Sequence, residues 1–156
     1  MTSEIVTDDP ELPIKGTTEV SLPVERMWDA FADVRAWRNW NPCIVWARVS
    51  GGELKEGARL YLAFRPIRRV YVYRLPGVAK IVECDPQRKV TWEAHAPGFH
   101  ARHSYLFEPL GPDSSRFGSW EVAEGPAYRL MRRFWLAHFR FVCDQSLAGA
   151  QMLGER

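Results

Sequence analysis

Four histidines and one glutamate in the second half of the chain carry the side chains best suited to moving protons. They are His95, His100, His103, His138 and Glu121. Imidazole titrates near neutral pH, and a neighbouring carboxylate can hold it in one tautomer. These residues are spread over several predicted elements, so any joint chemistry depends on a fold that brings them together.

His103 and Glu121 lie on consecutive predicted strands. His103 shares a strand face with Tyr105, and Glu121 shares one with Ser119. If both faces point inward, histidine and carboxylate meet and form a base that can take a proton from an activated carbon. The alternative is a buried polar pair that only orders the sheet, because buried polar groups usually occur in pairs. The sequence leaves both interpretations open.

His138 lies at the centre of an apolar helix stripe. An imidazole there can hydrogen-bond a carbonyl or hydroxyl group of a ligand. The alternative is a histidine that bonds to a strand partner. We include His138 with His103 and Glu121 as the candidate catalytic residues.

The grouping of His95, His100 and His103 raises the question of a metal site. Zinc sites use three or four ligands at characteristic spacings. Here a Pro-Gly turn separates His95 from the other two, and the spacing matches no zinc pattern. We therefore expect no metal and no cofactor. The sequence also lacks a nucleophile elbow, a P-loop and a dinucleotide fingerprint.

The element that must position His138 is a long helix predicted over residues 125–147. Gly125-Pro126 is a typical start signal, and no proline follows it. At about 100° per residue, one face carries Met131, Trp135, His138 and Val142. Tyr128 and Phe139 flank this face on one side, Phe134 and Phe141 on the other. Something large and concave must cover so broad an apolar stripe.

The elements before that helix follow a simple order. A strand at 14–22 precedes two short helices, one starting at Pro23 and one at 34–40. Strands are then predicted at 44–49, 58–64, 78–84, 89–95, 101–110 and 116–123, with a strand extension at 70–74 that ends at Leu75-Pro76-Gly77. Consecutive strands joined by short turns pair antiparallel. We therefore predict an α+β fold, in which a curved antiparallel sheet of about six to seven strands surrounds the long C-terminal helix and leaves a cavity beside it.

Aromatic side chains are unusually frequent, at 13% of residues with seven tryptophans. Most would fill the core, and some would line the cavity. The residues that we expect to contact a ligand are Trp40, Phe64, Trp92, Phe99, Tyr105, Met131, Trp135 and Phe139.

A basic segment at residues 65–74 contains four arginines and two tyrosines. It could attract an anionic headgroup or a membrane surface. The more ordinary interpretation is a charged sheet edge that prevents unwanted strand pairing.

Composition limits the remaining possibilities. The chain has 156 residues, 46% of them hydrophobic, and a net charge of +2, which gives no reason to expect nucleic acid binding. We expect a flexible leader at 1–13, one domain at 14–150 and a tail at 151–156. Three widely spaced cysteines, no signal peptide and no membrane span favour a cytoplasmic protein. We expect a monomer or a homodimer.

Several segments occur in a characteristic order. They are residues 22–33, Trp37, 40–42, 51–57 and 85–92, followed by His103, Glu121 and Gly125 before the long helix. This set resembles the START/Bet v 1-like (SRPBCC) superfamily, in particular its polyketide cyclase/dehydrase and lipid-transport type, over about residues 14–147. The resemblance implies a helix-grip fold with a hydrophobic cavity. The basic segment at 65–75 departs from the pattern, being longer and more basic.

The superfamily contains carriers, cyclases, aromatases and stress-response proteins, so the fold does not settle the chemistry. The first hypothesis is binding of a hydrophobic small molecule, such as a lipid, a polyketide or another polycyclic compound. The alternative is a metal-free cyclase or aromatase that uses His103, Glu121 and His138. The third is an interaction or stress-response domain whose interior is filled by its own side chains.

Overall fold

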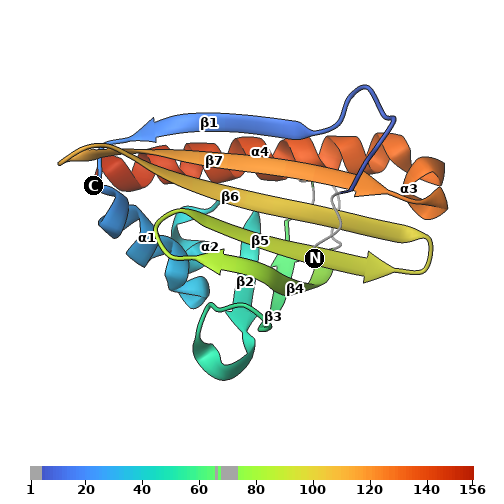
Figure 1. The fold of residues 1–156 in the computed structure, drawn as a ribbon, viewed down its shortest axis with the longest axis horizontal. Helices are drawn as coiled ribbons and strands as arrows, with labels where there is room; N and C mark the ends of the chain where they lie inside the picture. The colour runs from blue at the N-terminus through green and yellow to red at the C-terminus, as the bar shows by residue number, and fades with distance from the viewer. Residues whose placement is uncertain (1–4, 66, 68–73) are drawn as a thin grey trace.

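The computed structural model describes residues 5–65, 67 and 74–156, which form one curved sheet and several helices (Figure 1). The strands are β1 (Ile14–Val20), β2 (Ile44–Val49), β3 (Arg59–Phe64), β4 (Leu75–Asp85), β5 (Lys89–Ala96), β6 (Phe99–Gly111) and β7 (Ser114–Glu124). The helices are α1 (Val24–Ala32), the 3-10 turn η1 (Val34–Ala36), α2 (Trp37–Trp40), the 3-10 turn η2 (Ser50–Gly52), α3 (Pro126–Leu130) and α4 (Arg132–Gly154).

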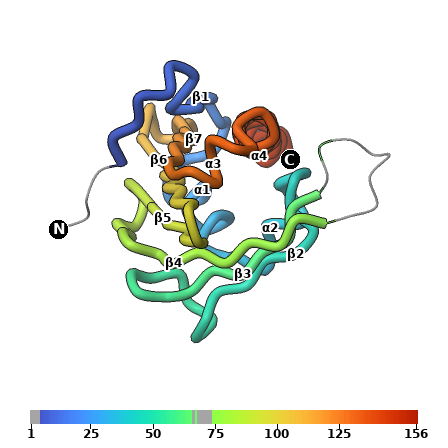
Figure 2. The backbone as a smooth tube through the Cα atoms, turned by 90° about the vertical axis from the view of Figure 1, so that its right-hand side faces the viewer, coloured from blue at the N-terminus to red at the C-terminus, as the bar shows by residue number. Residues whose placement is uncertain are grey.

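The seven strands are antiparallel and run in the order β1-β7-β6-β5-β4-β3-β2. Strands β2 to β7 pair with their neighbours in sequence, and β1 joins the far edge by pairing with β7. Figure 2 shows the sheet curving round from β1 to β2, with α4 seen end on in the opening between the two edges. This arrangement confirms the predicted α+β helix-grip fold.

One end of the space between sheet and helix is filled solidly. Phe31 of α1 packs 5.0 Å from Trp37 and 5.0 Å from Tyr105, measured between ring centroids. Phe107 and Phe117 complete this aromatic cluster. The side chains of α1 that point inward are apolar at helical spacing, so burying them supplies much of the stability of a helix too short to persist alone.

The last turns of α4 approach the backbone of α2 very closely. Ser146, Gly149 and Ala150 are buried there and small. A Cβ atom on Gly149 would lie 2.2 Å from the carbonyl oxygen of Trp40, so only glycine permits this distance. The close contact fixes the C-terminal half of the helix against the filled end of the fold.

The C-terminal helix differs from its prediction. It is divided at Met131, whose backbone (φ −114°, ψ 31°) leaves the helical region, and it continues to Gly154 rather than ending at 147. The amide of Ala127 donates to the carbonyl of Gly98 at 2.8 Å, which ties α3 to the β5–β6 turn. The predicted single helix is therefore two helices, α3 and α4.

Other differences concern element ends. The segment Leu75-Pro76-Gly77, predicted to break a strand, starts β4 instead and pairs with β3. Proline is acceptable there because it stands near the first residue of the strand. Residues 70–73 of the expected strand extension, and with them residues 66, 68 and 69 of the basic segment, lie outside the described residues.

The ends of the chain are more ordered than expected in the part described. Leu12 is buried, and Asp9 accepts hydrogen bonds from the hydroxyl of Tyr128 (2.7 Å) and the guanidinium of Arg132 (2.7 and 2.8 Å). Residues 151–154 belong to α4 rather than to a tail. Over the described residues, no helix is both long and apolar enough to cross a membrane.

Candidate functional site

A cavity of about 430 Å³ lies between the sheet and the first half of α4, beyond the aromatic cluster. Inward-facing residues of β3 to β7 form its floor, and α3 and α4 form its roof. Its walls are mainly apolar, which suits a ligand with little polar surface. The lining includes Leu62, Phe64, Trp92, Ala94, Phe99, Ala101, Met131, Trp135, Phe139 and Val142.

His103 and Glu121 face the cavity as a bonded pair. The register places them directly opposite each other on β6 and β7, and Nδ1 of His103 lies 2.6 Å from Oε2 of Glu121. Since a carboxylate only accepts, the histidine donates its Nδ1–H. Nε2 of His103 is 2.8 Å from Oγ of Ser119, so both ring nitrogens are occupied. The group of this pair that remains available to a ligand is therefore the second carboxylate oxygen of Glu121.

His138 projects from α4 into the same cavity and is 5% exposed. Its ring packs edge-on against Phe64, 4.8 Å away, and lies beside Trp135 and Phe139. Among the described residues, none forms a hydrogen bond with it. Burial lowers the pKa of His138 from 6.5 to about 4, although Glu121 favours the charged form. The imidazole is therefore neutral at physiological pH, with one donor and one acceptor facing an apolar space.

Polar groups below the cavity are already paired with one another. The hydroxyl of Ser146 contacts the amide of Asn41 at 3.0 Å and the phenol of Tyr105 at 3.4 Å. Burial raises the pKa of the neighbouring Cys43 thiol to about 12, so it stays protonated. We assign these residues to the core, because their hydrogen-bonding groups serve one another.

The structure brings the three candidate catalytic residues to one cavity and most of the candidate ligand contacts with them. Phe64, Trp92, Phe99, Met131, Trp135 and Phe139 all line it. Trp40 and Tyr105 do not: Trp40 is buried against Phe117 and Gly149, and Tyr105 stacks on His103 from the core side. Both face inward as predicted, but at the filled end.

Small residues that create the cavity were missing from the prediction. Ala94 and Ala101 are directly paired on β5 and β6 and leave room where larger side chains would close the space. Strand alternation puts both on the same face as Trp92 and His103. An alanine pair on an inward face was therefore a usable signal.

A second hollow, of about 530 Å³, lies on the outer face of the sheet under residues 5–7. Its lining includes Leu106, Trp120 and Arg102. It is larger than the inner cavity, but none of the three candidate acid–base groups reaches it. The inner cavity combines aromatic walls with an imidazole that has no hydrogen-bond partner among the described residues, so it is the candidate site.

Comparisons with known proteins agree with this architecture. The sequence model of the family described as polyketide cyclase/dehydrase and lipid transport matches residues 13–145. Among curated proteins, none matches the sequence.

Similar folds occur in solved structures of low sequence identity. The aromatase/cyclase Zhui from Streptomyces sp. R1128 is 16% identical, with a TM-score of 0.64 over 92% of this chain and 93% of that one. A START superfamily protein from Mycobacterium smegmatis is 18% identical, with a TM-score of 0.60 over 90% and 97%. The di-domain aromatase/cyclase BexL of the BE-7585A biosynthetic pathway is 12% identical, with a TM-score of 0.67; the match covers 92% of this chain but 46% of that one. At these identities the likeness extends to the fold.

Proposed function

Because the chain belongs to the polyketide cyclase/dehydrase and lipid transport family, we propose that it binds a flat, largely apolar small molecule that carries a hydroxyl or carbonyl group. The observation that carries this proposal is His138, a neutral imidazole without a described hydrogen-bond partner inside an aromatic cavity. A buried polar group of this kind is costly unless something pairs with it. A ligand oxygen at that position would supply the missing partner.

The dimensions of the cavity support a small ligand. Its volume of about 430 Å³ falls in the range of small-molecule sites, roughly 300–1,000 Å³. Trp92, Phe99 and Trp135 present ring surfaces on which a planar molecule can lie. Such a volume also counts against the third hypothesis, a domain whose interior is filled by its own side chains.

The proposal is tested with two probes that differ by one hydroxyl, naphthalene and 2-naphthol. Binding is measured by displacement of anilinonaphthalenesulfonate fluorescence from the full chain. We expect 2-naphthol to bind more tightly by about fivefold, because one hydrogen bond contributes about 1 kcal/mol. His138→Leu should remove this preference and leave naphthalene binding nearly unchanged.

A matched pair of tryptophan substitutions locates the binding. Ala94→Trp places a bulky ring inside the cavity, whereas Ala148→Trp adds the same ring to an exposed position of α4. We expect the first to abolish binding of both probes and the second to leave it intact. Failure of both naphthalenes to bind the folded wild type, or equal binding in the two variants, would contradict the proposal.

The bonded pair of His103 and Glu121 supports a second function, proton abstraction in a cyclisation. The free oxygen of Glu121 would take a proton from a carbon between two carbonyls, and His103 would stabilise the carboxylate in the correct orientation. The resulting enolate would attack another carbonyl carbon of the same molecule, whose oxygen would accept a hydrogen bond from His138 as it becomes an alkoxide. The proton taken by Glu121 would return to this oxygen, which gives the alcohol and restores the carboxylate.

The test is deuterium exchange at the central carbon of 1-phenylbutane-1,3-dione, followed by NMR. Catalysis predicts exchange above the buffer rate, lost in Glu121→Gln while dye binding persists. Exchange no faster than in buffer, with the diketone bound, would reject the enzyme and leave the binding function standing.

A further inference from the structure

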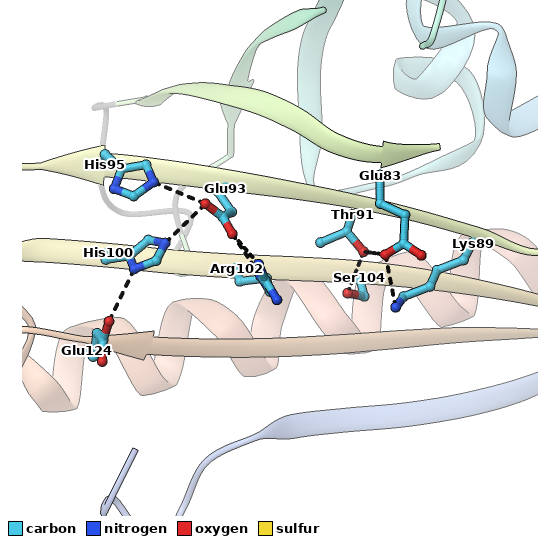
Figure 3. A network of polar contacts seen from close by, with 9 residues as sticks. All are labelled: Glu83, Lys89, Thr91, Glu93, His95, His100, Arg102, Ser104 and Glu124. Carbon is cyan, nitrogen blue, oxygen red and sulfur yellow. Dashed lines mark hydrogen bonds and ion pairs between the residues drawn. The ribbon is translucent and has the colours of Figure 1, made fainter. Parts of the chain in front are cut away.

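A second group of ionisable side chains lies on the opposite, outer face of the sheet, at the end of the β5–β6 hairpin (Figure 3). Glu93, His95 and His100 turn their polar ends toward one another there. Arg102 and Glu124 border them. Of the three, only His95 also lines the inner cavity, and none is among the candidate acid–base residues of that site.

Strand register explains why these residues gather. His95 is paired with His100, Glu93 with Arg102, and His100 with Glu124. Side chains directly opposite each other share a face, and residues two apart on one strand share it too. His103 stands an odd number of residues from His100, so it points into the cavity instead. The trio of histidines suggested by the sequence therefore does not form, and Glu93 takes the third position.

The three potential donor atoms are spaced as metal ligands are. Oε2 of Glu93 lies 3.1 Å from Nε2 of His95 and 3.3 Å from Nε2 of His100, and all three atoms lie within 4.8 Å of one another. Ligands about 2.0–2.1 Å from a tetrahedral zinc ion stand roughly 3.3–3.4 Å apart. The side chain of His95 is 63% exposed, so it has room to turn toward an ion.

His100 carries an independent sign of a missing partner. Its Nδ1 lies 3.2 Å from the carboxylate of Glu124, to which it donates. Nε2 lies 3.3 Å from the carboxylate oxygen of Glu93, and this buried nitrogen has no hydrogen bond in the described chain. A cation bound between the two atoms would take both as ligands. A carboxylate on the far nitrogen is also the usual support of a zinc-binding histidine.

We propose that Glu93, His95 and His100 bind a zinc ion, with water as the fourth ligand. Two imidazoles and one carboxylate are a donor set that zinc accepts in proteins. Arg102 occupies the other oxygen of Glu93, which leaves Oε2 as a single ligand atom. Glu93 and Glu124 carry two negative charges and Arg102 carries one positive charge. The site therefore has one net negative charge and attracts a cation. The bound ion would clamp the hairpin whose turn supports α3 at the edge of the cavity.

The test uses the full chain without an affinity tag, freed of metal by a chelator. Zinc binding is measured by competition with a chromophoric chelator, and stoichiometry by elemental analysis. Wild type should bind one zinc ion per chain at micromolar concentration. His100→Gln and Glu93→Gln should weaken binding at least tenfold, whereas Glu108→Gln, an exposed glutamate on β6, should not.

Two further measurements separate this site from other causes of metal uptake. Glu124→Gln, which leaves the three ligands in place, should weaken zinc binding by about tenfold to a hundredfold. Cobalt should give visible d–d bands without the near-ultraviolet charge-transfer band of a thiolate, which excludes Cys84. If the protein binds no zinc at millimolar concentration, the cluster is only an ion-pair network and the proposal is overturned. Equal binding in wild type and His100→Gln, or a cobalt–thiolate band, would also overturn it.

Discussion

The buried imidazole of His138 makes a quantitative prediction about stability and pH. Its pKa falls from 6.5 in the unfolded chain to about 4 in the folded protein. Between these values the unfolded state binds a proton that the folded state does not. The contribution of His138 to the free energy of unfolding is therefore fully present above pH 6.5 and is lost as the pH falls toward 4.

The magnitude follows from the two pKa values. Complete loss corresponds to about 3 kcal/mol, since one pH unit is worth about 1.4 kcal/mol. Between about pH 7 and pH 4.5 the expected loss is about 2 kcal/mol. His138→Leu replaces the ring with a side chain that does not titrate. Between pH 7 and pH 4.5 the variant should therefore lose about 2 kcal/mol less unfolding free energy than the wild type.

The assay is urea unfolding of wild type and His138→Leu at several pH values, followed by tryptophan fluorescence. The remaining titrating groups are common to both proteins and cancel in the difference. The denaturant slope should be equal in the two, so that midpoints report free energy. If both proteins lose the same stability between pH 7 and pH 4.5, His138 does not lie in an apolar, neutral environment and the proposed ligand contact loses its basis.

Three further predictions concern the fold around the site. Gly149→Ala should lower the free energy of unfolding by about 1–3 kcal/mol in urea titrations, because its Cβ meets the Trp40 backbone, whereas Gln151→Ala on the exposed face should not. Asp9→Asn should flatten the acid limb of the stability curve: Arg132 holds the pKa of Asp9 well below its ordinary value, so its contribution is present above that ordinary value and lost as the pH falls below it. Cys43 should react with a thiol reagent at the rate of unfolding, and rapid modification of the folded protein would contradict its assignment to the core.

The order of elements and the meeting of His103 with Glu121 could be predicted from the sequence, because both depend on strand parity and on short turns. Parity also separates His103 from His100, which excludes the histidine trio. The hydrogen bond from Ser119 to His103 could not be foreseen, since it depends on side-chain rotamers. The division at Met131 could not be foreseen either, since no proline or glycine marks it and the turn that α3 contacts at Gly98 is distant in sequence.

The placement of Trp40 and Tyr105 shows what cannot be learned from the direction of side chains alone. Alternation and helical spacing identify which side chains point inward, but not whether the space they enter is filled. That depends on the neighbouring side chains, which are the aromatic cluster around Phe31 at one end and the alanine pair of β5 and β6 at the other.

The difference in side-chain size between the two ends of the fold therefore explains where the cavity lies. At Gly149 the helix touches the backbone of α2, and the aromatic cluster around Phe31 fills the space at that end. The alanine pair of β5 and β6 lies at the other end, across the cavity from Trp135 and Phe139, and leaves the space empty. His138 belongs to this part of the helix, which is why its imidazole is both buried and available to a ligand.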